Sequence, residues 1–258
     1  WSLLGFLFAV YAVTANDSIQ TLGTYISSNN DIKWYWMFAY MGSIFLITML
    51  EGFNVGDPAF GRLDNFPEID IQWYHAVAPL VLVALTRLKI PVSTTFLVLS
   101  VFASSVVMEK MLLKSFLGYA VSFVFAWGSW YLISKYFLNE GEKGKNKYNN
   151  YWRIGQWVTT GWLWSTWLKH DLANIMVFLP RYSNLENTYF EFFVIGTMLL
   201  GLAFMFYERG GRIQEIVLSK TNTRYVRSAT LIDLVYCFVL YYFKEVNKAQ
   251  LKIFNDCY

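Results

Sequence analysis

Charged residues are scarce in this chain, making up only 15% of its 258 residues. Soluble domains average roughly a quarter charged residues, whereas 56% of this chain is hydrophobic, so the composition argues against a soluble protein. The net charge of +3 is small, which argues against the strongly basic surface typical of nucleic-acid-binding domains. We therefore expect an integral membrane protein that binds no nucleic acid.

Cysteine and histidine are almost absent, with two residues of each. Cys237 lies in an apolar segment and Cys257 in the tail, without the paired spacing that a metal site requires. The sequence also lacks a recognisable nucleophile–base pair and a glycine-rich phosphate loop. These absences argue against an enzyme, and we expect neither a resident metal nor an organic cofactor.

Long polar stretches are rare, and apolar segments recur along the whole chain. Most are close to the ~20 residues that cross a bilayer core of ~30 Å. The predicted crossings, about eight, are residues 1–14, 34–50, 73–88, 92–108, 115–138, 152–168 running on into 172–179, 188–207 and 228–243. Trp and Tyr gather at the segment ends, as in an interfacial aromatic belt. The sequence thus predicts an all-α, multi-pass protein of the lipid bilayer, in the plasma or inner membrane.

The one long polar stretch, residues 139–151, divides the chain into two hydrophobic units. It is rich in Gly, Asn and charged residues, which is typical of a linker. We therefore expect a first transmembrane repeat at residues 1–138 and a second, truncated repeat at residues 152–258. The linker carries more basic than acidic residues, so we expect it to be cytoplasmic.

Loop charges predict that the two repeats have opposite orientations in the membrane. Residues 51–72 contain five acids and one base, whereas residues 208–227 contain five bases and two acids. By the positive-inside rule the second loop is cytoplasmic and the first is outside. Equivalent loops on opposite sides are what inverted repeats require. The sequence therefore predicts a transporter-like helical bundle with an inverted repeat.

A polar break interrupts one apolar segment in each repeat. The first break contains Asp17 and Gln20, and the second, at residues 169–174, contains Asp171 and Asn174. Each aspartate precedes a carboxamide by three residues, a spacing that places both side chains on one face of a helix. A carboxylate in a membrane segment is costly, which favours an ion ligand, a proton carrier or the partner of a buried base. The alternative is a cap on the second half of a broken helix.

Three consecutive hydroxyl residues, Ser93, Thr94 and Thr95, precede the apolar residues 96–108. Pro91 just before them suits the first turn of a helix. Hydroxyls beside the free N–H groups of a helix start form a neutral donor array for a tetrahedral oxyanion. In the alternative interpretation these hydroxyls bond the backbone or neighbouring helices. The spacing alone leaves both interpretations open.

Two further basic side chains also have two interpretations each. His170 beside Asp171 could relay protons near neutral pH, or it could mark an interfacial helix end next to Lys169. Arg181 could bind an anion, or it could extend to the membrane interface. Neither choice follows from the sequence.

These motifs resemble those of the inorganic phosphate transporter family known as PiT. That family carries an A-N-D-x-x-N-x-x-G-T signature, which residues 15–24 resemble, and a later P-V-S-T-T-H, which residues 91–96 resemble. Residues 171–174 (DLAN) are similar to a second copy of the signature. The resemblance implies Na⁺- or H⁺-coupled symport of phosphate. Sulfate is also tetrahedral, so the motifs do not choose between the two anions.

The resemblance also implies a role for each matching residue. On the coupling-ion side, with Na⁺ at the two aspartates, it places Asn16, Asp17, Gln20, Asp171 and Asn174. On the phosphate side it places Ser93, Thr94 and Thr95.

The chain departs from the family pattern at several positions. Gln20 replaces an asparagine in the first signature, His170 replaces one in the second, and Phe96 replaces the histidine of the hydroxyl motif. The 154-residue offset between the aspartates predicts a second hydroxyl motif at residue 247, but residues 245–248 contain no hydroxyl. A second hypothesis is therefore a non-transporting PiT-like subunit of a larger complex. A third is a transporter whose second half-site is completed by a partner subunit or a second copy of the chain.

Overall fold

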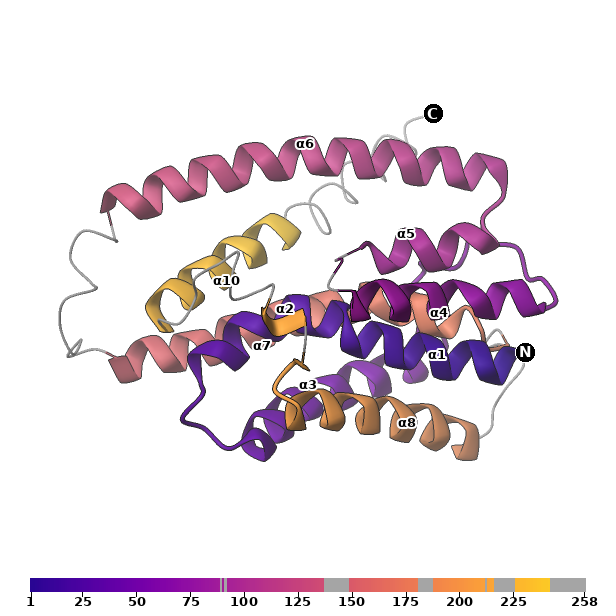
Figure 1. The fold of residues 1–258 in the computed structure, drawn as a ribbon, viewed down its shortest axis with the longest axis horizontal. Coiled ribbons are helices and arrows are strands. Elements are labelled where there is room, and N and C mark those ends of the chain that lie inside the picture. The colour runs from indigo at the N-terminus through magenta and orange to yellow at the C-terminus, as the bar shows by residue number, and fades with distance from the viewer. Residues whose placement is uncertain are drawn as a thin grey trace.

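The computed structural model describes residues 1–88, 90, 92–136, 149–180, 188–211, 213–215 and 226–241. Within these residues every regular element is a helix and no strand is present. Most of the helices lie along the long axis of the molecule (Figure 1). The all-α class predicted from the composition is confirmed for this part of the chain.

α1 (Ser2–Ala15) and α2 (Asp17–Ser28) form one kinked apolar rod. Asn16 joins them with φ −119° and ψ −69°, well away from the ideal helical values of about −63° and −42°. Its N–H nevertheless donates to the carbonyl of Ala12, and its carbonyl accepts from the N–H of Gln20, both at 3.0 Å. The first predicted break is therefore a kink that retains backbone hydrogen bonds on both sides.

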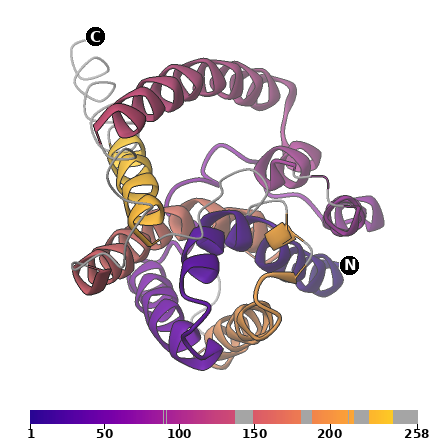
Figure 2. The ribbon, with the colours of Figure 1, turned by 60° about the vertical axis from the view of Figure 1, so that its left-hand side comes forward.

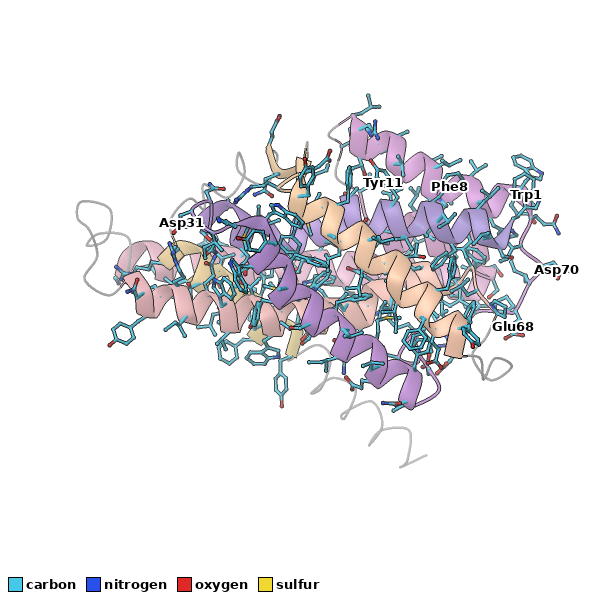
Figure 3. The ribbon with its side chains drawn as sticks, turned by 90° about the horizontal axis from the view of Figure 1, so that it is seen from below. Trp1, Phe8, Tyr11, Asp31, Glu68 and Asp70 are labelled. Carbon is cyan, nitrogen blue, oxygen red and sulfur yellow. The ribbon has the colours of Figure 1, made fainter. Side chains whose placement is uncertain are left out.

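α3 (Trp34–Asn54) and α7 (Asn149–Met176) run parallel to each other. Two ion pairs join them near both ends: Arg153–Asp31 at 2.6 Å and Lys169–Glu51 at 2.6 Å. In Figure 3 Asp31 lies at one end of the molecule, and Trp1, Glu68 and Asp70 lie at the other. The acidic loop that follows α3 is thus at the same end as the start of α1.

α7 is continuous through residues 169–174, where a second broken helix was predicted. That prediction is wrong, because the polar side chains find partners without opening the backbone. Lys169 pairs with Glu51, and His170 contacts Arg62. α7 also begins inside the predicted linker; the rest of that linker, residues 139–148, lies outside the described residues.

α8 (Thr188–Tyr207) runs antiparallel to α3, since Tyr207 meets Trp34 edge-on at 5.7 Å between ring centroids. α10 (Val226–Tyr241) begins against the start of α7, where Thr230 donates to the carbonyl of Trp152 at 3.0 Å. The buried core draws on α1, α2, α3, α7 and α8, and its largest members are Phe6, Tyr25, Trp164, Phe178 and Phe206.

α4 (Trp73–Arg87), α5 (Thr94–Leu99) and the 3₁₀ turn Ser100–Phe102 form a hairpin. The start of the first arm lies beside the end of the second, because the rings of His75 and Phe102 stack with their centroids 4.8 Å apart. Figure 1 shows that the hairpin enters from the end of the molecule that holds the N-terminus and turns back midway. The hairpin is therefore re-entrant.

The hairpin replaces two of the predicted crossings, at residues 73–88 and 92–108. α4 has 15 residues, which span only about 22 Å of a ~30 Å core. The second helical run stops at Phe102, since Ala103 is extended with φ −80° and ψ 135°. The prediction of one continuous crossing at residues 92–108 is therefore wrong.

α6 (Ser105–Tyr136) is the longest helix of the described chain and runs the full length of the molecule. It stands apart from the main bundle (Figure 2). Among its described side chains between Ser105 and Ser129, none is buried.

Among the described residues, four helices are long and apolar enough to cross a membrane: Ser2–Ser28, Trp34–Asn54, Ser105–Ser129 and Tyr189–Tyr207. This finding agrees with a multi-pass membrane protein. The predicted count of about eight crossings is not confirmed, because α4 and α10 are short and α7, although long, is rich in polar residues.

Candidate ion and oxyanion site

A cavity of about 630 Å³ lies where the kink of the α1–α2 rod meets the tip of the α4–α5 hairpin, α7 and α10. Six residues that the sequence singled out line it: Asp17, Gln20, Ser93, Thr94, Thr95 and Asp171. Segments separated by more than 75 positions in the sequence thus line one cavity.

The kink is joined to the hairpin tip by the side chain of Asn16, which is fully buried. Its amide nitrogen lies 3.1 Å from the carbonyl oxygen of Val92 and 3.0 Å from the hydroxyl of Thr94. The Thr94 hydroxyl in turn donates to the Asp17 carboxylate at 2.6 Å. Gln20 donates to the Asn16 side-chain oxygen at 3.0 Å. Asn16 therefore acts as the connection between the two elements, beneath the cavity surface.

On α7, Asp171 lines the cavity, whereas Asn174 is not among the lining residues and lies behind them. Here buried oxygens are left open. Asn174 donates to the Thr95 hydroxyl at 3.2 Å. Oδ2 of Asp171 and Oδ1 of Asn174 have no hydrogen-bond partner in the described part of the chain, although both residues are buried. A buried polar atom without a partner calls for an explanation such as an ion. Carboxylate and amide oxygens are ligands that hard cations prefer.

The three hydroxyls of the hairpin tip are not equivalent. Thr94 donates its hydrogen to Asp17 and so is committed to the carboxylate. The Ser93 oxygen accepts from the N–H of Phe96 at 3.3 Å, and the Thr95 oxygen accepts from Asn174. Because a hydroxyl has one donor as well as its acceptor sites, Ser93 and Thr95 each keep a hydrogen that can be donated to a ligand.

His170 is not among the residues that line the cavity. Its Nδ1 contacts the guanidinium of Arg62, a residue of the acidic loop between α3 and α4. A guanidinium only donates, so this contact requires Nδ1 to be unprotonated. Burial lowers the pKa of Arg62, and the nearby Asp171 carboxylate acts in the opposite direction. The predicted proton relay through His170 stays a prediction.

One cavity carboxylate was missed in the sequence, Asp233 of α10. It is buried, with 1% of its surface exposed. It accepts hydrogen bonds from Thr24 at 3.0 Å and from Thr160. A signal was present, since Asp233 is the single acid in the predicted crossing at residues 228–243. The rule that flagged Asp17 and Asp171 applies to it equally.

The described lining of the cavity is acidic in composition. It contains three carboxylates, Asp17, Asp171 and Asp233, and neither lysine nor arginine. Arg181 and residues 245–248, where an anion ligand and a second hydroxyl motif were considered, lie outside the described residues.

No protein-family model matches the chain, and no curated protein or solved structure matches it. The resemblance to phosphate transporters therefore depends on the motifs at residues 15–24, 91–96 and 171–174. The function must be inferred from the chemistry of the cavity.

Proposed function

We propose that the chain is an ion-coupled symporter of the PiT type that carries inorganic phosphate together with Na⁺ or H⁺. The observation that carries this proposal is the single cavity shared by carboxylates and free hydroxyls, without a basic residue in its described lining. Inorganic phosphate carries about one to two negative charges near neutral pH. Such an anion is repelled by the carboxylates until a cation neutralises them. Coupling then follows from charge, because the anion binds only after the cation.

The cation is placed at Asp17, Asp171 and Asn174. Asp171 and Asn174 supply the two buried oxygens that lack partners, and Asp17 lines the same cavity from the opposite element. Asn16 and Gln20 hold Asp17 in position through their amide hydrogen bonds. This arrangement suits a cation that takes oxygen ligands.

The oxyanion is placed on the hydroxyls of Ser93 and Thr95, which keep donor hydrogens. Thr94 joins the two parts of the site, because it donates to Asp17 from the same turn that presents the other two hydroxyls. Phosphate is the first candidate and sulfate the second. Neither anion needs a resident cofactor here, and the function is not enzymatic.

Chain direction supports an inverted repeat as the transport unit. α7 runs opposite to the α1–α2 rod, and α8 runs opposite to α3 (Figure 1). α4 enters from one end of the molecule, whereas α10 enters from the other. We infer that the repeats are residues 1–138 and 152–258 and that they rock against each other to expose the cavity alternately. The plasma or inner membrane is the proposed location.

Uptake of radiolabelled phosphate into reconstituted vesicles tests this function, with a Na⁺ gradient in one arm and a proton gradient in the other. The Asp17→Asn variant should lose gradient-driven uptake while still inserting into the membrane. Asp70→Asn, which alters an exposed carboxylate of the acidic loop, is the matched control and should transport normally. Unchanged uptake by Asp17→Asn would defeat the assignment. Competition with sulfate separates the two anions.

A non-transporting subunit is the second candidate function, and α6 is the observation that favours it. Its residues between Ser105 and Ser129 are not buried by the described chain, so the helix offers a long apolar face to lipid or to a partner. Copurification of a stoichiometric partner, together with absence of phosphate and Na⁺ binding by the isolated chain, would select this candidate over the symporter.

A further inference from the structure

Asp233 is a cavity carboxylate outside every motif that the sequence indicated. Its oxygens accept from Thr24 of α2 and Thr160 of α7, so three helices meet at this one side chain. It faces the same cavity as Asp17 and Asp171. The buried Asp233 carboxyl group is thus held by two hydroxyl groups, and no described basic side chain pairs with it.

A charged carboxylate at this position is energetically costly. Burial removes the water that would stabilise the charge, and two hydrogen bonds from hydroxyl groups replace only part of that stabilisation. The titratable groups that line the same cavity are Asp17 of α2, Tyr119 of α6, Asp171 of α7 and Tyr236 of α10, and Cys237 of α10 interacts electrostatically with Asp233. All of these groups are neutral or negative, so they favour the uncharged form of Asp233.

The hydrogen bonds of Asp233 favour a proton over a metal ion as its neutralising ligand. At Asp171 an oxygen is open, which suits a cation that needs several oxygen ligands. At Asp233 both oxygens are already occupied by hydroxyls that point at them. A proton needs only one carboxyl oxygen and one acceptor, and a threonine hydroxyl becomes an acceptor by rotating.

We propose that Asp233, with Thr24 and Thr160, is a proton-binding site of the cavity, separate from the cation site at Asp17 and Asp171. Protonation converts Asp233 from an acceptor of two hydrogen bonds into a donor of one. It thereby changes the connection of α10 to α2 and α7. The role of this proton in coupling rests on the proposed symport function, whereas proton binding itself does not.

Infrared difference spectroscopy on the full chain in nanodiscs tests proton binding directly. The wild type should show a buried protonated-carboxyl band that titrates with pH and shifts when the chain carries aspartate labelled with ¹³C in the side chain. The band should be lost in Asp233→Asn, moved in Asp233→Glu and kept in Asp70→Asn. Absence of the band from the wild type, or its persistence in Asp233→Asn, would overturn the proposal.

Two further variants keep the test decisive if Asp233→Asn fails to fold. Thr24→Val and Thr160→Val retain the carboxyl group but each remove one hydroxyl. Each should shift the frequency of the band, because the C=O bond loses a specific hydrogen-bond partner. A band that stays at its wild-type frequency in both variants would assign the proton to another carboxyl group and contradict the proposal.

Uptake measurements separate failure of this proposal from failure of the proposed function. Acidifying the side from which the wild type takes up phosphate should raise the uptake rate, by up to about tenfold per pH unit while the site is mostly unprotonated. Asp233→Asn should lose this pH dependence and keep its Na⁺ dependence. A wild type that binds the proton but transports nothing contradicts the symport function alone. A variant that keeps the wild-type pH dependence of uptake contradicts the coupling role of Asp233.

Discussion

The two aspartates of the predicted repeat occupy very different surroundings. Asp17 follows a kink, and its carboxylate is held by Asn16 and Thr94. Asp171 lies in the last two turns of an unbroken helix, with one oxygen open. The same Asp-x-x-amide spacing thus occurs on two kinds of backbone. The spacing determines which face the side chains share, whereas the neighbouring elements determine whether the helix bends and whether an oxygen stays free.

The largest expected effect comes from Asp171→Asn, which removes the charge at the open position. Loss of one partner of a buried charged interaction costs about 3–5 kcal/mol, so Na⁺ affinity should fall by at least about a hundredfold. Na⁺-dependent tryptophan fluorescence of the purified protein measures this, with Trp167 in the cavity lining as reporter. An affinity within threefold of wild type would show that the open oxygen is not a ligand.

The next effect concerns the connection at the kink. Asn16→Ala should destabilise the protein by about 2–3 kcal/mol, because buried partners at Val92, Thr94 and Gln20 lose their hydrogen bonds. Asn174→Ala removes a single bond to Thr95 and should cost about 1 kcal/mol. Unfolding in detergent compares the two variants. Equal losses would mean that the kink is not specially supported by its asparagine.

A second pair of variants compares the roles of the two threonine hydroxyls. Thr95→Val should weaken phosphate binding by about fivefold, which corresponds to one hydrogen bond of about 1 kcal/mol, with little change in stability. Thr94→Val should instead lower cation affinity and stability, because it leaves the Asp17 carboxylate without its hydroxyl donor. Isothermal titration with phosphate and with Na⁺ separates the two outcomes. The reverse pattern would exchange the roles assigned to these residues.

The smallest expected effect is at the end of the predicted second break. Lys169→Gln removes the ion pair with Glu51, in which the side chains are 23% and 50% exposed. Exposed pairs contribute about 0–1 kcal/mol, so stability and helix content should change little. A marked loss of helical circular dichroism in this variant would mean that the ion pair is what keeps α7 continuous.

The sequence predicted which residues line the cavity better than it predicted the path of the backbone. Asp17, Asp171 and Ser93 could be identified because each is a polar residue within or beside an apolar segment. Polar residues in membrane segments often mark functional sites. Asp233 followed the same rule but has no neighbouring polar residue, so it formed no motif. Its partners, Thr24 and Thr160, come from other helices and are not visible in one dimension.

The errors in predicting the path of the backbone have one physical origin. Hydropathy indicates that a segment lies in an apolar environment, but it does not indicate whether the segment crosses the membrane or turns back. The arms of the α4–α5 hairpin are as apolar as two separate crossings, and only the length of α4 shows that it cannot span a membrane. The polar residues of α7 suggested a break because their partners, Glu51 and Arg62, are more than 100 positions away. A helix whose side chains are satisfied by other elements has no need to open its own hydrogen bonds.

The re-entrant hairpin also affects how the molecule would respond to voltage. Its helices run from the end of the molecule that holds the N-terminus to about midway along the long axis (Figure 1), and residues at its tip line the cavity. Water carries ions readily and protein does not, so a membrane potential falls mainly along such a plug. Each elementary charge that moves past it would exchange up to about 2.3 kcal/mol with every 100 mV. The hairpin therefore makes the energy of a charge in the cavity depend on the membrane potential.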